Sequence, residues 1–186
     1  MASGCWSESC KRAADVMRSR GMNAEISDFA GFYAASRDDC LRTVLASVGD
    51  LDRARDLVDE AFARAWASWR TVRRHPAPRA WVVRTALNAG VSAWRRRRRE
   101  VPLSGDGPFP AGHGAGDGLV DRDIMAALRR LPERQRQVVA LRLFLDLDTA
   151  GTAEVLGIAP GTVTAHLARA IATLREELTT WNGVPQ

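Results

Sequence analysis

Apolar residues recur every three or four positions along two long stretches of the chain, which is the spacing of one face of an α-helix. In the first stretch, Ser27 or Asp28 can cap a helix that the "VGD" of residues 48–50 then ends. A second helix is expected over about 51–72, and the two prolines of "RRHPAP" then force a turn. The apolar positions of these two helices are Phe29, Phe32, Tyr33, Leu41, Val44, Leu45 and Val48, followed by Ala54, Leu57, Val58, Ala61, Phe62, Ala65, Trp66 and Trp69.

Three more helices are predicted, one before a Gly/Pro-rich break in the chain and two after it. One runs from about Arg79 into the run of arginines that begins at Arg95. In the second stretch, "IMAALRRL" and "RQRQVVALRLFL" have the helical period, and Pro132 starts the latter. No segment of either stretch reads as a strand, so the fold is predicted to be all-α.

The end of the second stretch has the spacing of a helix-turn-helix. A short helix ends at Leu156, Gly157 suits the left-handed position that closes a helix, and a longer helix begins near Pro160. An ordinary helical hairpin is the alternative. In a helix-turn-helix the second helix enters the major groove of DNA. The polar side chains available there are Thr162, Thr164, His166 and Arg169, while Val163, Leu167 and Ile171 are expected to pack inward.

A linker separates the two stretches. Residues 101–119 contain six glycines and three prolines, a composition that sustains neither helix nor strand and predicts flexibility. Its "GHGAGDG" resembles a phosphate loop only loosely, because the Lys-Ser/Thr pair and the preceding strand are missing. We therefore expect two small helical domains joined by a flexible linker, the C-terminal one carrying the helix-turn-helix. The expected parts are a disordered N-terminal extension (1–26), the domains (27–100 and 120–181) and a tail (182–186).

Charge is distributed unevenly along the chain. The formal net charge is +5, but residues 70–100 hold ten arginines and one acid, whereas residues 50–69 hold five acids and three arginines. A positive field confined to one segment indicates a polyanionic partner for that segment. The preference for arginine over lysine can reflect a GC-rich genome, but the clustering cannot.

Other functional classes receive little support. The three cysteines form no C-x-x-C pair and lie far from the three histidines, so neither a disulfide framework nor a metal site is predicted. No stretch approaches 18 apolar residues and the N-terminus lacks the apolar core of a signal peptide, so we expect a cytoplasmic protein without membrane insertion. No histidine lies near a plausible nucleophile, so no catalytic residue and no cofactor is assigned.

The segment "PRAWVVRTALNAGVSAWRRRRRE" can bring bases and phosphates to one helical face. Aromatic, amide, hydroxyl and guanidinium groups recur there at spacings of three or four, a mixture that binds unstacked bases. These residues are Trp81, Thr85, Asn88, Ser92 and Arg95. Alternatively, Trp81 and Trp94 are core residues and the arginines a solvated helix end. A membrane-surface helix is disfavoured because the apolar residues are small and an acidic helix precedes them.

Together these segments resemble an extracytoplasmic-function sigma factor of the sigma-70 family. "VGDLDRARDLVDEAFARAWASW" is similar to the family's region 2.2, and the segment from Pro78 to Glu100 to regions 2.3 and 2.4. "ALRRLPERQRQVVALR" and "LGIAPGTV…LARAIATLREEL" are similar to regions 4.1 and 4.2. The N-x-x-x-S-x-W-R-R-R-R form resembles the sigma-E-like subgroup of actinobacteria. The resemblance covers roughly residues 27–178, with both domains in the expected order.

The resemblance implies a role for each segment. It implies RNA polymerase core (the β′ clamp helices and the β flap), promoter DNA and an anti-sigma factor as partners, and no enzymatic activity. The implied core-binding residues are Asp56, Leu57, Val58, Asp59, Glu60, Phe62, Arg64 and Trp66. Those implied at the −10 element are Arg73, Arg74, His75, Arg84, Asn88, Ser92, Trp94, Arg95, Arg96, Arg97 and Arg98. Those implied at the −35 element are Thr162, Val163, Thr164, His166 and Arg169.

Some positions depart from the family pattern. Asp59 stands in place of a common glutamine, and Gly151 and Thr152 stand in place of Glu-Ile, which predicts a weaker first helix of the helix-turn-helix. Thr164 and Ala165 stand where a basic residue and serine are common, which predicts a weaker or differently specific −35 contact. The alternatives to a sigma factor are a stand-alone two-domain helix-turn-helix regulator and an Arg-rich RNA-binding protein. Only the sigma interpretation requires stoichiometric binding to core polymerase.

Overall fold

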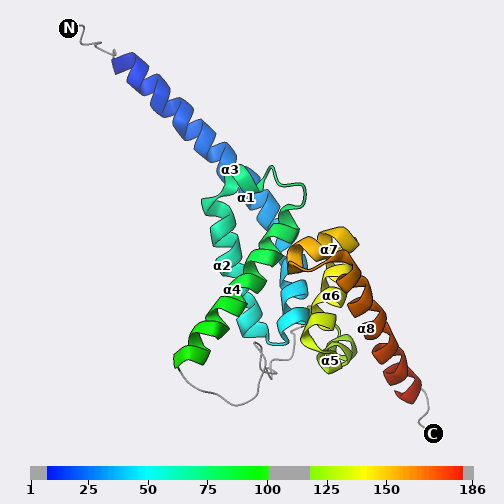
Figure 1. Cartoon of the computed structure of the whole chain (residues 1–186). Coiled ribbons are helices and arrows are strands. Elements are labelled where there is room, and N and C mark those ends of the chain that lie inside the picture. Colours follow the sequence, from blue (N-terminus) through cyan, green and yellow to red (C-terminus); the bar gives the residue numbers. More distant parts are fainter. Residues whose placement is uncertain (1–7, 101–117, 182–186) are drawn as a thin grey trace. The chain divides into compact units, whose positions relative to one another are not determined.

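Every regular element that the structure describes is an α-helix, which confirms the predicted all-α class (Figure 1). The structure, a computed structural model, describes the backbone of residues 8–100 and 118–181, and side chains within 22–91 and 118–176. The helices are α1 (Glu8–Val48), α2 (Leu51–Ala67), α3 (Trp69–Val72), α4 (Pro78–Glu100), α5 (Arg122–Arg130), α6 (Glu133–Phe144), α7 (Thr149–Leu156) and α8 (Pro160–Trp181). The predicted tail and all of the predicted linker but its last two residues lie outside this description.

Helix α1 begins at Glu8, which is 19 or 20 residues before the residues predicted to cap it. The prediction that Ser27 or Asp28 caps it is wrong, because the helix runs from Glu8 through both. Nothing between them stops a helix: there is no proline, and the single Gly21 costs only about 1 kcal/mol relative to alanine. Residues 8–26, expected to be disordered, are thus helical. The internal contacts of the chain divide it into two units, Met1–Ala35 and Ser36–Gln186.

The helices before residue 101 form the first helical block, and those after residue 117 form the second. The first helical block is built around α2 and α4, which pack side by side (Figure 1). The carboxylate of Asp50 caps α2 by accepting a hydrogen bond from the amide of Arg53 at 2.9 Å. The predicted apolar stripe of α2 is buried except at Trp66, whose surface is 42% exposed. The predicted single helix over 51–72 is interrupted at Ser68, so that α3 forms a separate turn. The residues of α4 that pack inward are Ala80, Val82, Val83, Ala86 and Leu87.

The second helical block contains the predicted helix-turn-helix. Gly157 closes α7 in the left-handed conformation, at φ 63° and ψ 39°, as its position in the sequence predicted. The chain bends by 102° between α7 and α8. This angle lies within the range of about 90–120° for helix-turn-helix motifs, which rules out an antiparallel hairpin. Among the helices that the structure describes, no single one is long and apolar enough to span a membrane. Only α7 and α8 taken together reach that length and apolar character, and they are bent relative to each other.

The core of this block comes from three of its helices. Buried Val138 of α6, Ala153 of α7 and Val163 of α8 form its centre, and Leu167 packs against them as predicted. The prediction that Ile171 packs inward is wrong, because the side chain is 39% exposed. Leucine and valine side chains each contribute about 1.5–3 kcal/mol when fully buried. This packing therefore holds α8 at a fixed angle to α7.

The unusual Gly151–Thr152 pair is accommodated within α7. The carboxylate of Asp148 caps the helix by accepting from the amide of Gly151 at 2.7 Å. A Cβ at Gly151 would lie 3.2 Å from that same carboxylate oxygen, so glycine allows a close cap. Thr152 is fully buried, and its hydroxyl has no hydrogen-bond partner among the described residues. The expected weakness of this helix therefore has a second physical source, an unpaired buried hydroxyl.

Two arginines of the second block bind the C-terminal end of α1, within the unit Ser36–Gln186. Arg136 donates from Nε to the carbonyl oxygen of Ser47 at 3.0 Å, and Arg129 donates from Nη2 to that of Gly49 at 3.1 Å. Burial lowers the pKa of the Arg136 guanidinium, an effect that neighbouring Glu133 opposes. Cations are favoured at this end of a helix because the last carbonyl groups point outward.

Candidate nucleic-acid interface

The loop between α3 and α4 is held in shape by its own hydrogen bonds. Arg74 donates its backbone N–H to Thr71 at 3.1 Å, and His75 donates its own to Val72 at 3.0 Å. The amide of Ala77 donates to Nδ1 of His75 at 3.0 Å. The side chain of Arg74 is exposed and that of His75 is half-buried. The loop therefore presents basic and aromatic groups on a fixed backbone, with Arg73 exposed at its start.

One face of α4 carries the polar residues that the sequence singled out. Arg84 and Asn88 are exposed, and Trp81 and Thr85 are half-buried. The hydroxyl of Thr85 donates to the backbone carbonyl oxygen of Trp81 at 2.8 Å, so this hydrogen bond does not involve the indole ring. Trp81 is thus neither a full core residue nor a free ring, and a part of its surface remains available for stacking. We call the group Trp81, Arg84, Thr85 and Asn88 the α4 polar face.

The arginine run continues this helix. The backbone of α4 is helical to Glu100. Position 92 lies four residues after Asn88 and position 95 three residues after that, so both positions share the helical face of Asn88. The side chains of Ser92, Trp94 and Arg95–Arg98 lie outside the described residues. Their place is therefore known by helical register alone.

Arg84 has an acidic neighbour in the second helical block. Its Nη1 lies 3.8 Å from Oε1 of Glu154 on α7, and both side chains are about half exposed or more. An exposed ion pair at this separation contributes little, on the order of 0–1 kcal/mol. A phosphate could therefore replace this carboxylate at small cost. This pair could not be predicted from a local sequence pattern, because its members are far apart along the chain.

The exposed side of α2 is acidic. Asp56, Asp59 and Glu60 are exposed at helical spacing, and Trp66 follows further along α2. We call these four residues the acidic face. Arg64 is also exposed and forms an ion pair with Glu60. The other residues that the resemblance assigned to core binding are buried in this structure and support the face from beneath: Leu57, Val58 and Phe62.

The N-terminal part of α8 exposes the residues expected at base edges. Thr162, Thr164 and Arg169 are exposed, and the hydroxyl of Thr164 donates to the carbonyl oxygen of Pro160 at 3.3 Å. His166 is half-buried, and its Nδ1 has no hydrogen-bond partner among the described residues. Val163 is fully buried, so its side chain belongs to the core, as the helical period predicted, and cannot touch DNA in this conformation.

Comparison with known families accounts for both helical blocks. Residues 32–100 match the family model described as sigma-70 region 2, and residues 121–174 match that described as sigma-70, region 4. Taken together, the two matches cover most of the chain and leave the segment between them unassigned.

Relatives resemble the chain over most of its length. It is 34% identical over 155 residues to the RNA polymerase sigma-E factor of Streptomyces coelicolor, covering 83% of this chain and 88% of that one. It is 28% identical over 143 residues to the RNA polymerase sigma factor SigV of Bacillus subtilis, covering 77% and 86%.

Solved structures agree with the fold. The sigma factor RpoE from Bartonella quintana, solved in complex with the anti-sigma factor NepR, has a TM-score of 0.68 over 82% of this chain and 97% of that one, at 27% identity. CnrH, solved with the cytosolic domain of CnrY, has a TM-score of 0.56 at 21% identity and supports the fold alone.

The fold and the two matches together define a promoter-recognition factor that contains sigma-70 regions 2 and 4. The chain belongs to the sigma-70 family, as an extracytoplasmic-function sigma factor similar to the sigma-E factors of Streptomyces. It is a transcription initiation factor that directs RNA polymerase to promoters.

Proposed function

We propose that the three described surfaces divide the work of promoter recognition. The acidic face docks on the β′ clamp helices of core polymerase, and the second block docks on the β flap. The α3–α4 loop and the α4 polar face bind and open the −10 element, while the start of α8 reads the −35 element. The observation that carries this division is the separation of charge on neighbouring helices: exposed carboxylates on α2, and exposed guanidinium and amide groups on α4.

Opening of the −10 element has a physical cost that this arrangement can offset. Flipping a base out of the duplex costs a few kcal/mol in lost stacking and pairing. The α4 polar face supplies an indole for stacking and an amide for base edges, and the loop supplies guanidinium and imidazole groups for the edges of an unpaired base. No reaction is assigned to the chain and no cofactor or metal is required, because RNA synthesis belongs to the polymerase core. We further propose a cytoplasmic location.

An anti-sigma factor is part of the proposal. The similar RpoE of Bartonella quintana was solved with the anti-sigma factor NepR. A partner of this kind that covers the acidic face or the α4 polar face would block core or promoter binding directly.

The test is core dependence. Specific promoter footprints are expected only with core polymerase present, and tight specific footprints of the isolated chain at physiological salt would support the stand-alone regulator instead. The paired change Asp56→Lys and Asp59→Lys should abolish transcription and core binding while the melting temperature stays near that of the wild type, because both side chains are exposed. The matched control is Asp28→Lys with Asp38→Lys, the same charge change on exposed positions of α1.

A second experiment separates base reading from phosphate binding. Asn88→Ala and Arg74→Ala should leave the salt dependence of promoter binding nearly unchanged but reduce the preference for the matched −10 sequence and slow its opening. Equal losses on matched and mismatched promoters would remove both residues from base reading.

A further inference from the structure

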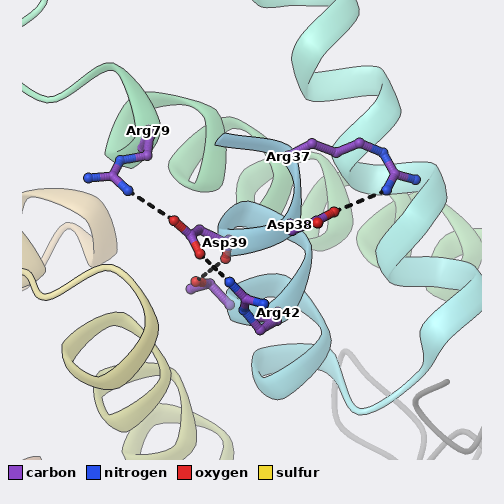
Figure 2. A network of polar contacts seen from close by, with 6 residues as sticks. Arg37, Asp38, Asp39, Arg42 and Arg79 are labelled. Atoms are coloured by element: carbon purple, nitrogen blue, oxygen red, sulfur yellow. Dashed lines mark hydrogen bonds and ion pairs between the residues drawn. The ribbon is translucent and has the colours of Figure 1, made fainter. Parts of the chain in front are cut away.

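An ionic network joins α1 to the first turn of α4 (Figure 2). Asp39 of α1 accepts from Nη1 of Arg79 at 3.0 Å through one carboxylate oxygen, and from Arg42 through the other. Arg79 lies 40 residues away in sequence, whereas Arg42 lies on the same helix. The side chain of Asp39 is only 28% exposed, compared with 51% for Arg79. The neighbouring Asp38 turns to Arg37 at 3.4 Å and does not take part.

Arg79 is the second residue of α4 and follows the α3–α4 loop directly. Its backbone is held from α1 as well, since Sγ of Cys40 lies 3.9 Å from the carbonyl oxygen of Arg79. The loop is fixed at its other end by the buried side chains of Trp69 and Val72. The Asp39–Arg79 pair therefore anchors the end of the loop that α3 does not hold.

We propose that Asp39 is a positioning residue for −10 recognition: through Arg79 it sets the place of the α3–α4 loop and of the first turn of α4. The inference rests on the proposed function of that loop. Asp39 is an acid beside a surface meant for a polyanion, so a direct contact with DNA would be repulsive. Its contribution is to hold the loop in the geometry that receives an unpaired base, before the base arrives.

The expected effect is selective. Partly exposed ion pairs have coupling energies that correspond to about 1.4- to 5-fold in an equilibrium constant. Asp39→Asn should therefore reduce the preference of holoenzyme for a matched over a mismatched −10 sequence by about 1.4- to fivefold. Binding to nonspecific duplex should not weaken, because removing a negative charge next to Arg42 and Arg79 makes that region more attractive to phosphates. A structural lesion would weaken both.

The experiment uses holoenzyme assembled from core polymerase and the full chain. Fluorescent single-stranded oligonucleotides with a matched or a mismatched −10 segment are titrated, and nonspecific duplex is titrated in parallel. The variants are Asp39→Asn, Arg79→Gln and the two combined. The combined variant should lose no more preference than the worse single variant, because the two residues act as one pair. Melting temperature and core affinity are measured for each to show that it folds.

Two control variants test whether the effect is specific to the Asp39–Arg79 pair. Asp38→Asn removes an adjacent carboxylate that does not reach α4, and Arg42→Gln removes the partner of Asp39 that lies within α1. Both should keep the wild-type preference. The inference is overturned if Asp39→Asn keeps the full preference, if its loss equals that of either control, or if the losses of the single variants simply add. If the wild-type holoenzyme itself shows no −10 preference, the proposed function fails instead.

Discussion

Two fully buried threonines should respond in opposite directions to the same substitution. Thr43 of α1 and Thr152 of α7 are both 0% exposed. The hydroxyl of Thr43 donates to the carbonyl oxygen of Asp39 at 2.7 Å, whereas that of Thr152 has no partner among the described residues. Replacement by valine exchanges the hydroxyl for a methyl group of similar size in each case. The two variants therefore isolate the value of one buried hydrogen bond.

The magnitudes follow from these contacts. An intramolecular hydrogen bond contributes about 0.5–1.5 kcal/mol net, and a buried group without a partner costs about 1–3 kcal/mol. Thr43→Val should therefore lower the free energy of unfolding by about 1 kcal/mol, and Thr152→Val should raise it by about the same amount. For a chain of this size, 1 kcal/mol corresponds to a shift of about 2–4 °C in melting temperature.

Calorimetry of the full chain measures both shifts, and hydrogen exchange assigns them to α1 or to α7 and α8. Exposed Thr164→Val is the matched control and should change the melting temperature very little. Promoter choice should be unchanged in Thr152→Val, because this side chain lies in the core. A Thr152→Val variant that is no more stable than the wild type would refute the reasoning, since its hydroxyl would then be satisfied after all.

Three further predictions concern the thiol, the arginine run and the N-terminus. Burial raises the pKa of Cys40 to about 12 from an ordinary value of 9.0, with smaller opposing effects of Arg79 and Asp39. The unfolded thiol thus ionises first, and the free energy of unfolding should fall by up to about 1.4 kcal/mol per pH unit between pH 9 and 12. Cys40→Ala should lack this component in denaturant titrations across that range, and an identical pH dependence would contradict it. Replacing Arg95–Arg99 with glutamine should flatten the slope of log K against log salt by roughly 2–4 units, and an unchanged slope would mean a solvated helix end. A chain starting at Met22 should keep the melting temperature and transcription of the full chain, because residues 1–21 show no apolar periodicity; a large loss of melting temperature would show that they pack.

The periodic part of the fold was predictable from the sequence. The stripe of α2 predicted its buried face, and Gly157 predicted the turn before α8, because both depend on interactions within a few residues. The start of α1 was not predictable in this way. A capping residue permits a helix to begin but does not require it, and no breaker stands between Glu8 and Ser27.

The candidate site was predictable only residue by residue. The pattern indicated which residue types lie on α4 and α8, but not their surroundings. Ile171 lies near the inward period of α8, yet the neighbouring Ala170 is the residue that is fully buried there, and Ile171 is left at the edge of the buried stripe with 39% of its surface exposed. The Asp39–Arg79 and Arg84–Glu154 pairs depend on how helices approach one another, and a single sequence has no local signal for that approach.

The hydrogen bond inside the α3–α4 loop determines which tautomer His75 adopts. Because Nδ1 accepts the amide proton of Ala77, the neutral ring must carry its own proton on Nε2. The atom left for a partner is then a donor. An unpaired base can meet it with a ring nitrogen or a carbonyl oxygen, but an exocyclic amine would face it proton to proton. The backbone amide of Ala77 thus makes Nε2 of the neutral ring a hydrogen-bond donor, and this donor favours acceptor atoms on a base over amino groups.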